Sequence, residues 1–476
     1  METITKPQLS AAIPDPLNRI LQDEPCLTRA YLVGGFVRDG LLNQASKDID
    51  IEVFGVSFED LAVALRKWGR VDLVGKSFGV IKLTPPGCAT VDVAIPRTES
   101  KTAPGHRGFE ASFDPLMSLT EASRRRDFSL NALFYDPRER CVIDCHGGLQ
   151  DLQDGVLRMV DSDTFADDPL RVLRAMQFIA RFDLRGDPSL VNQSAAIKAS
   201  FLELASERVC DEWTKWASQC LVPSRGLVFL RDCGWLDHFP ELAAMRGVPQ
   251  DPEWHPEGDV FQHTLHCCDA LAQLEEWRRL SREDRIVSML AVLLHDIGKA
   301  TTTQKVERGG RMRIISPGHE SVSAREAAVF LRQMGFSNAI QDRVIPLIAN
   351  HMIHLQSPSD RAIRRLAHRL QPETIEGLCL VMKADSFGRP PKPKVLPQTV
   401  SALLSHSKRL TLSQGAPQPL ILGRDLLKLG QEPGPALGRR LKQLFEAQLD
   451  GVFQDKAGGL QWLAQHELEK EEGRSS

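Results

Sequence analysis

Two aspartates separated by one residue are the first feature of this chain with chemical consequences. The run Asp48-Ile49-Asp50-Ile51 begins thirteen residues after Gly35. In an extended strand, Asp48 and Asp50 point to one face, while the two isoleucines point to the other, apolar face. Adjacent carboxylates repel each other unless a cation neutralises them. We therefore expect both aspartates to be catalytic and to hold a pair of Mg²⁺ ions of the kind used in phosphoryl transfer.

A third acid and a glycine turn have the spacing to complete such a site. Asp92 lies between two valines and is the candidate for a third catalytic carboxylate. An apolar run ends at Gly34-Gly35, and the residues after it have the pattern of a helix start. Glycines let the main chain approach a phosphate closely, and the first helical turn offers its amide groups. We expect Gly34, Gly35 and Arg38 to bind the triphosphate of a nucleotide.

Polar side chains gather again in RRRDFSLN, residues 124–131. Arg126 offers a cation for a phosphate, and Asp127 and Asn131 offer a carboxylate and an amide for ribose hydroxyls. We expect these three residues to bind the nucleotide. A solvent-exposed basic surface is the alternative for the arginines.

A proline at a helix start places Asp168 and Arg171 one turn apart on the same face. Cytosine and adenine each present an exocyclic amine beside a ring nitrogen that accepts hydrogen bonds. Guanine and uracil present a carbonyl beside an N–H instead. A carboxylate beside a guanidinium therefore matches cytosine and adenine and opposes the other two bases. An ordinary salt bridge between Asp168 and Arg171 is the alternative.

Histidines and aspartates recur through the second half of the chain at positions suited to a metal site. An apolar helix is expected to end in HDIGK, residues 295–299, and the other candidates lie in separate helical segments. Imidazole and carboxylate side chains are typical ligands of divalent metals. Buried core histidines are the alternative for any one position. The candidate ligands are His263, His295, Asp296, His319, His351 and Asp385.

The elements that must position these residues change character along the chain. Short apolar runs with period-two alternation, separated by turns, occupy residues 28–145, with an intervening helix at VALRKWG, residues 63–69. From residue 164 onward the periodicity is helical. We predict an α+β multidomain fold, with a small mixed sheet followed by helical domains. The predicted boundaries are 1–155, 156–225, 226–397 and 398–476.

Composition excludes several classes of protein. The chain has 476 residues, of which 42% are hydrophobic and 25% charged, so a disordered or fibrous protein is excluded. Its net charge is −3, which excludes a globally basic surface and confines any nucleic-acid contact to local patches. The chain contains no apolar run long enough to cross a membrane. Ten scattered cysteines favour a reduced, cytoplasmic protein, and the oligomeric state stays open.

Five ordered motifs resemble those of class II tRNA nucleotidyltransferases, the CCA-adding enzymes, within the polymerase-β-like superfamily. They are GGFVRD (34–39), KDID (47–50), RRDFSLNA (125–132), DCHGGLQDL (144–152) and DDPLRVLRA (167–175). The resemblance implies that Asp127 tests the ribose 2′-hydroxyl and that Asp168 and Arg171 select CTP and ATP. Arg174 of the last motif is a further candidate nucleotide ligand. Asp167 stands where the family usually has Glu, which shortens a supporting side chain.

The helical half resembles the HD phosphohydrolase superfamily, in which such ligands surround one or two divalent metals and Asp296 would form a bridge. Some bacterial CCA-adding enzymes carry this domain, with phosphatase and 2′,3′-cyclic phosphodiesterase activities. The polar stretch of residues 97–121 matches the flexible loop of the family, and residues 420–451 match the region that holds tRNA. Arginine clusters at residues 361–369 and 439–442 are candidate phosphate contacts or ordinary solvated helix faces.

These observations together predict a nucleotidyltransferase head, a helical neck, an HD body and a tRNA-binding tail. The expected reaction is addition or repair of the 3′-terminal CCA of tRNA from CTP and ATP, without a nucleic-acid template. A second, phosphohydrolase activity is expected in the HD domain, with a metal that the sequence does not identify. The alternatives are an A-only or CC-only enzyme, a poly(A) polymerase, and an HD phosphohydrolase whose head only binds RNA.

Overall fold

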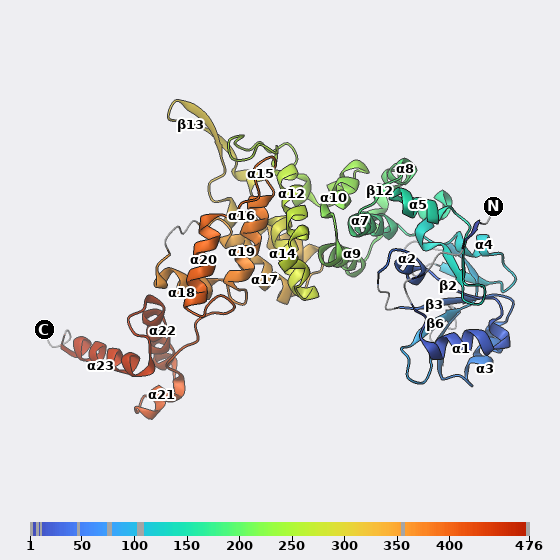
Figure 1. Cartoon of the computed structure of the whole chain (residues 1–476). Helices are drawn as coiled ribbons and strands as arrows, with labels where there is room; N and C mark the ends of the chain where they lie inside the picture. Colours follow the sequence, from blue (N-terminus) through green and yellow to red (C-terminus); the bar gives the residue numbers. More distant parts are fainter. Residues whose placement is uncertain are drawn as a thin grey trace. The chain divides into compact units, whose positions relative to one another are not determined.

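The computed structural model describes residues 3–5, 9, 12–44, 48–73, 79–101, 109–353 and 358–472. The chain divides into two compact units, Met1–His238 and Phe239–Ser476 (Figure 1). Unit 1 contains a mixed sheet with helices, and unit 2 is almost entirely helical, so the predicted α+β fold class is confirmed. The finer division into four segments stays a prediction. No helix within the described ranges has both the length and the apolar character needed to cross a membrane.

The sheet of unit 1 forms from the β-branched, alternating runs that mark strands in the sequence. Its strand order is β1-β10-β9-β2-β3-β6-β5-β4. β3 and β6 run parallel to each other, whereas every other neighbouring pair of described strands in this sheet is antiparallel. The strands are β1 (Thr3–Thr5), β2 (Ala30–Val33), β3 (Asp50–Val53), β4 (Arg70–Leu73), β5 (Val80–Thr84), β6 (Val91–Ala94), β9 (Leu133–Asp136) and β10 (Cys141–Asp144).

The sheet has an apolar cluster on each face. The larger cluster combines Ile51 and Val53 of β3 and Val91 and Val93 of β6 with side chains of α1 (Asp15–Asp23), α2 (Gly35–Leu41) and α3 (Phe58–Leu65). The smaller cluster lies under α4 (Leu119–Ser123). Because side chains alternate along a strand, Asp50, Glu52 and Asp92 share the face opposite the larger cluster.

The helix predicted over residues 63–69 lies earlier in the chain, at α3. Its start is fixed by Ser57, whose hydroxyl accepts the main-chain N–H of Asp60. It ends at Leu65 because the chain must turn into β4 at Gly69. A Cβ on Gly69 would lie 2.4 Å from the carbonyl oxygen of Thr84, so this turn packs directly against the neighbouring strand.

The stretch predicted as a loop at residues 97–121 contains regular structure. β7 (Arg97–Lys101) and β8 (Phe109–Phe113) pair antiparallel in register, with Arg97 opposite Phe113. Residues 102–108 lie outside the described residues. The alternation in FEASF is a strand signal that the surrounding Gly and Pro residues obscure.

Helices complete unit 1 after the sheet. Two short strands, β11 (Val156–Leu157) and β12 (Arg185–Gly186), pair in parallel beside them. The α-helices that follow β10 are α5 (Gly148–Asp154), α6 (Ser162–Phe165), α7 (Leu170–Phe182), α8 (Pro188–Ala196), α9 (Ser206–Gln219) and α10 (Pro223–Asp232), whereas η3 (Ser129–Asn131) comes before β9.

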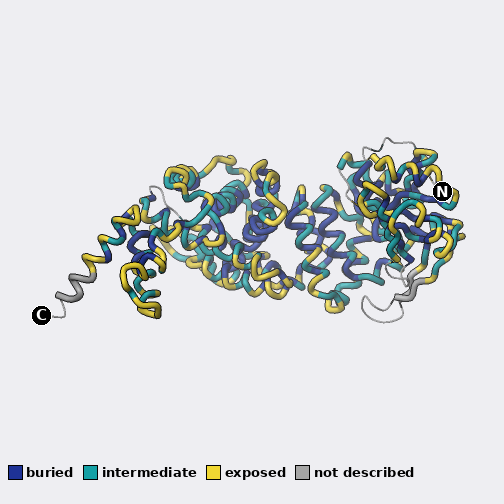
Figure 2. The backbone as a smooth tube through the Cα atoms, turned by 90° about the horizontal axis from the view of Figure 1, so that it is seen from below, coloured by how far each residue is buried: buried dark blue, intermediate teal, exposed yellow. Residues whose placement is uncertain are grey.

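Unit 2 is a helical body with one hairpin, formed by β13 (Gln304–Arg308) and β14 (Arg311–Ile315). The body helices are α12 (Val260–Gln273), α14 (Arg282–Leu294), α16 (His319–Gln333), α17 (Asn338–Asn350), α18 (Asp360–Arg369), α19 (Ile375–Phe387) and α20 (Gln398–Arg409). α14 is buried over most of its length, which explains its near-continuous apolar sequence. Figure 2 shows buried residues gathered in the interior of the helical body and exposed residues along its outside. The helices α21 (Gly423–Lys428), α22 (Pro435–Asp450) and α23 (Lys456–Glu472) follow, with a small core of their own.

One close approach in unit 1 gives a direct test of this packing. A Cβ on Gly148, the first residue of α5, would lie 2.3 Å from the carbonyl oxygen of Ser129 in η3. We expect Gly148→Ala to destabilise unit 1 by about 1–3 kcal/mol, as overpacking does. Hydrogen exchange of the full chain should show faster exchange in η3 and α5. Gly438→Ala in α22, where an added Cβ meets nothing within 4 Å, is the control and should leave exchange unchanged.

Candidate active sites

The predicted acid site forms at the junction of β2, β3 and β6. Asp50 is the first residue of β3 and lies directly opposite Asp92 of β6 and Val33 of β2. Gly34 follows Val33 as the cap of α2 with φ +67°, a conformation that favours glycine. A Cβ on Gly34 would lie 3.8 Å from Asp50 Oδ2, so the turn and the carboxylate are neighbours. Asp48 is exposed, two residues before the strand begins.

Negative charge accumulates at this junction. Partial desolvation and the carboxylate of Asp92 both raise the pKa of Asp50, although its side chain is open to solvent. Asp92 pairs with Lys82 of β5 at 2.9 Å, which offsets one of the charges. Carboxylate oxygens grouped at an accessible strand end suit a hard divalent cation, so the donor set fits the expected ion.

Glu52 is a residue of this face that the sequence analysis did not single out. It lies two residues after Asp50 but is buried, and it accepts hydrogen bonds from Arg125 at 2.9 Å and Arg126 at 3.0 Å. Burial raises the pKa of Glu52, but the two arginines outweigh burial and hold the pKa below its usual value. Arg126, predicted to bind the nucleotide, also donates to the carbonyl oxygen of Asn131. The alternation along β3 was the available signal for Glu52.

Asp127, Asn131, Arg174 and Arg38 form one hydrogen-bonded network. Asp127 accepts from Arg174 Nε at 2.7 Å and from Asn131 Nδ2 at 2.8 Å. Asn131 Oδ1 in turn accepts from Arg38 Nη1 at 2.6 Å. Burial raises the pKa of Asp127, but the Arg174 charge and the hydrogen bonds from Asn131 and Arg174 together outweigh burial and hold the pKa below its usual value. The four predicted nucleotide-binding residues are therefore brought together.

Arg38 occupies a buried position at the base of this network. Its guanidinium also contacts Asp39 at 2.6 Å and lies over the rings of Phe178 and Phe182 of α7. The side chain thus connects α2 to α7 as well as to Asn131. Gly35 lies beside it, since a Cβ there would be 3.5 Å from Arg38 Nη2.

The predicted base-reading pair lies at the start of α7, but each member has its own partner. Asp168 accepts from the main-chain N–H of Leu170 and pairs with Arg208 of α9 at 2.8 Å. Arg171 donates to the carbonyl oxygens of Thr164 at 2.8 Å and Arg125 at 2.6 Å. The arrangement differs from the simple salt bridge considered as the alternative. Arg208 lies 40 residues from Asp168, too far along the chain for spacing to have indicated it.

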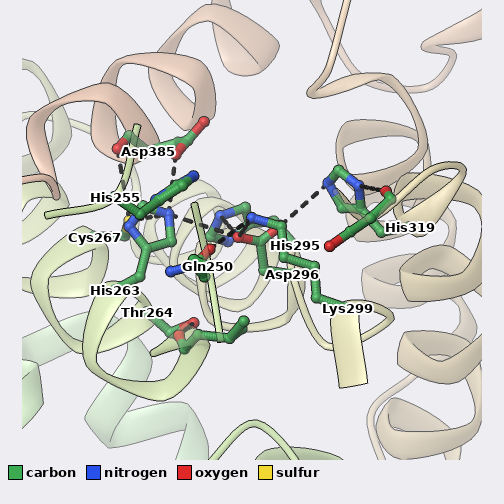
Figure 3. Close-up of polar contacts among 12 residues, drawn as sticks. Gln250, His255, His263, Thr264, Cys267, His295, Asp296, Lys299, His319 and Asp385 are labelled. Atoms are coloured by element: carbon green, nitrogen blue, oxygen red, sulfur yellow. Dashed lines mark hydrogen bonds and ion pairs between the residues drawn. The ribbon is translucent and has the colours of Figure 1, made fainter. Parts of the chain in front are cut away.

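Unit 2 brings all six predicted metal ligands into one cluster, in which Asp385 is half-buried and the other five are buried. Figure 3 labels each of them except His351. Asp296 lies at its centre, where its carboxylate oxygens are 3.2 Å from Nε2 of His295 and of His319. His351 Nε2 lies 3.3 Å from His319 Nε2, and His263 Nε2 lies 3.1 Å from Asp385 Oδ1. The ligands come from the ends of α14 and α17, the start of α16, and the interiors of α12 and α19.

The main chain sets the orientation of three of these imidazoles. Nδ1 of His295, His319 and His351 each lies 2.7 Å from the carbonyl oxygen three residues earlier. Because a carbonyl only accepts hydrogen bonds, each Nδ1 carries a proton and each Nε2 is left as a donor atom for a metal. Burial and the neighbouring His295 lower the pKa of His351 to about 3, which keeps that imidazole neutral.

The central atoms of the cluster lack hydrogen-bond partners within the described residues. Neither oxygen of Asp296 accepts a hydrogen bond within the described part of the chain, and His295 Nε2 likewise has no hydrogen-bond partner there. The Lys299 ammonium lies 2.7 Å from Asp296 Oδ2 without hydrogen-bond geometry. Buried polar atoms are almost always paired, so these unpaired atoms fit the binding of a divalent cation.

Three neighbours of the cluster escaped the sequence analysis. Glu257 is buried and contacts Nδ1 of both His255 and His263, at 2.8 Å and 2.7 Å. Burial raises the pKa of Glu257, but the two imidazoles outweigh it and lower the pKa to about 2. Cys267 lies one helical turn after His263, and Arg389 pairs with Asp385 at 2.6 Å. The four-residue spacing of His263 and Cys267 was a usable signal, whereas Glu257 carried none.

A cavity of about 550 Å³ opens onto the metal cluster. Its wall includes Asp296, His319 and His351, the cations Lys299 and Arg389, and residues at the base of the β13–β14 hairpin. Cations beside a metal cluster suit an anionic substrate such as a phosphate ester.

The arginine cluster predicted over residues 361–369 joins α18 to α22. Arg365 pairs with Asp450 at 2.6 Å and Arg361 pairs with the same carboxylate at 2.9 Å. Arg364 donates to the carbonyl oxygen of Leu449. These three guanidinium groups hold two helices together, and their contact with phosphate stays a prediction.

Comparison with known proteins places both sites in context. The poly A polymerase head domain family matches residues 30–158, and the HD domain family matches residues 260–389. A multifunctional CCA protein of Pasteurella multocida is 34% identical over 376 residues, covering 76% of this chain and 84% of the relative. One of Methylococcus capsulatus is 33% identical over 433 residues, covering 87% of this chain and 93% of the relative.

Solved structures agree in fold. The Thermotoga maritima CCA-adding enzyme complexed with tRNA superposes with a TM-score of 0.58 at 19% identity, covering 95% of this chain and 96% of that one. The Bacillus stearothermophilus CCA-adding enzyme in complex with CTP gives a TM-score of 0.64 at 19% identity, covering 97% and 100%.

The Glu52 ion pairs give a prediction about pH. The pKa of Glu52 is lower in the folded than in the unfolded chain, so its stabilisation is present above the unfolded pKa and is lost as pH falls through the folded pKa. Glu52→Gln should cost about 3 kcal/mol at neutral pH, because two arginines lose a buried partner. At neutral pH, hydrogen exchange in β3 should be faster in Glu52→Gln than in the unsubstituted chain. This difference in exchange rate should become smaller at acidic pH. Glu59→Gln, at an exposed position of α3, should match the unsubstituted chain at each pH.

Proposed function

The chain belongs to the family of multifunctional CCA proteins, and from that premise we propose that unit 1 adds or repairs the 3′-terminal CCA of tRNA from CTP and ATP. The observation that carries this proposal is the pairing of Asp50 with Asp92 across two parallel strands beside the Gly34 turn. Metal-bound phosphates and a nucleophilic hydroxyl need such a cluster of carboxylates within reach of main-chain amides. A tRNA substrate and the free cysteine thiols favour a cytosolic location for the protein.

Asp48, Asp50 and Asp92 would hold two Mg²⁺ ions, which lower the pKa of the RNA 3′-hydroxyl and neutralise the triphosphate. Asp50 and the Gly34 turn are neighbours, so the reacting phosphate lies between carboxylate and amide groups. Lys82, which pairs with Asp92 at 2.9 Å, offsets part of the negative charge of these carboxylates. Asp127, fixed by Arg174 and Asn131, receives a ribose hydroxyl.

Base selection would use the start of α7. Asp168 accepts from the exocyclic amine of cytosine or adenine, and Arg171 donates to the adjacent ring nitrogen. Arg208 would orient Asp168, because the two side chains form an ion pair at 2.8 Å. Guanine and uracil would place a donor against Arg171 and an acceptor against Asp168.

We also propose a phosphohydrolase activity in unit 2. The Asp296 oxygens accept no hydrogen bond within the described residues, which favours this activity because they suit a divalent cation that would activate water. Lys299 and Arg389 line the same cavity and would bind the phosphate oxygens. The nearby β13–β14 hairpin carries Lys305, Arg308 and Arg311, all exposed, which favours an RNA phosphate as substrate.

Stepwise extension of truncated tRNA tests the first activity. Transcripts that end before the CCA, after one C and after two Cs should be extended with CTP, CTP and ATP respectively when each nucleotide is supplied alone with Mg²⁺. Asp50→Asn should lower kcat about a thousandfold, since loss of a metal ligand removes several kcal/mol of charge stabilisation. Glu59→Gln is the matched control. Extension by only one of the two nucleotides would indicate an A-only or CC-only enzyme instead.

Phosphate release from 2′,3′-cyclic nucleotides and 2′-phosphates tests the second activity. The full chain should hydrolyse one of these in the presence of a transition metal, and His295→Ala should abolish hydrolysis. CCA addition should persist in that variant, because Asp50 and His295 belong to different compact units. Hydrolysis that persists in His295→Ala would contradict the assignment of the metal cluster.

A further inference from the structure

A cysteine thiol faces the metal cluster of unit 2. Cys267 is fully buried on α12, and its Sγ lies 3.3 Å from His263 Nε2 (Figure 3). Sγ also lies within 4.8 Å of donor atoms on His295 and Asp385, and the four donor atoms are all within that distance of one another. The four side chains come from α12, the end of α14 and α19.

Packing holds this thiol at the cluster. Gly388, which ends α19, lies against α12 so closely that a Cβ on it would be 2.4 Å from Cys267 Sγ and 2.7 Å from the Cys267 nitrogen. A small side chain at residue 388 is therefore required for the position of Cys267.

A second observation points to a ligand at this position. His295 Nε2 is buried and has no hydrogen-bond partner within the described residues, while its Nδ1 is anchored to the carbonyl oxygen of Val292. A buried nitrogen that is held in place but has no hydrogen-bond partner is suited to bind a cation. The thiol, the carboxylate of Asp385 and His263 Nε2 lie near it and would supply the other donor atoms.

We propose that Cys267 is a metal ligand of unit 2 and completes a four-donor set with His263, His295 and Asp385, which selects a thiophilic divalent cation such as Zn²⁺ over Mg²⁺. The inference rests on the metal site of the proposed phosphohydrolase. One sulfur, two imidazole nitrogens and one carboxylate oxygen are donors typical of zinc and cobalt, whereas Mg²⁺ prefers oxygen alone. Coordination replaces the S–H bond with a metal–sulfur bond, and the proton passes to solvent.

The donor spacing agrees with this set. Tetrahedral bonds of roughly 2.0–2.3 Å keep donor atoms about 3.3–3.8 Å apart. His263 Nε2 lies 3.3 Å from Cys267 Sγ and 3.1 Å from Asp385 Oδ1. A separate group of His295, Asp296 and His351 shares only His295 with the set, so Asp296 keeps its own place at the centre of the cluster.

Cobalt spectroscopy of the metal-stripped full chain tests the proposal without reference to activity. Added Co²⁺ should produce the near-ultraviolet charge-transfer band of a thiolate–cobalt bond. The band should be lost in Cys267→Ala and kept in Cys268→Ala, a buried cysteine next along the helix that serves as the matched control. Competition with a chelator should show Zn²⁺ binding weakened about tenfold or more in Cys267→Ala, and CCA addition by each variant checks that the chain is folded.

The outcomes separate this proposal from the one on which it rests. Co²⁺ uptake by the unsubstituted chain without a thiolate band, and with equal Zn²⁺ affinity in Cys267→Ala, would show a metal site from which the thiol is excluded and would overturn the inference. Failure of the chain to bind Co²⁺ or Zn²⁺ at all would overturn the metal site itself. A band that also disappears in Cys268→Ala would assign the signal to a disturbed helix and would equally contradict the role of Cys267.

Discussion

Carboxylates that lie side by side repel each other unless positive charge compensates them, and both candidate sites depend on this compensation. In unit 1 the pairing of β3 with β6 places Asp50 opposite Asp92, and Lys82 compensates only part of their charge. In unit 2 Asp296 lies among His295, His319 and His351, whose Nδ1–H groups donate to main-chain carbonyl oxygens and not to the Asp296 carboxylate. Packing elsewhere in each unit must hold these groups together against their repulsion. The sheet core does so for the aspartates, and helix ends do so for the histidines.

A single strand shows how the same residue type takes different roles. Asp50 and Glu52 share one face of β3, but Glu52 is buried and neutralised by Arg125 and Arg126, while Asp50 stays open to solvent. The ion pairs of Glu52 therefore fix the two arginines that come before β9. Glu52 has a structural role, and Asp50 is the acid of this strand that stays accessible to the cation we propose.

Short-range patterns allowed much of this to be predicted from the sequence. Alternation along β3 and β6 indicated that the acids share a face, and separate helical segments indicated the six ligands, of which Asp296 is one. Partners remote in sequence could not be predicted in this way. Arg208 reaches Asp168 only because α7 and α9 pack together, and Glu257 reaches His263 from an irregular segment. The pairing of β7 with β8 was missed because Gly and Pro residues interrupt a short alternating signal.

Arg38 has a consequence for how one pocket would serve two nucleotides. It connects the helix that follows the glycine turn to Asn131, and its guanidinium lies against Phe178 and Phe182 on the helix that begins with the base-reading residues. Asp127 and Arg174 connect the segment that contains Asn131 to the same helix. These contacts join the glycine turn, the segment of Asp127 and Asn131, and α7. A displacement of the proposed base-reading residues would therefore be passed through Arg38 to the proposed phosphate turn.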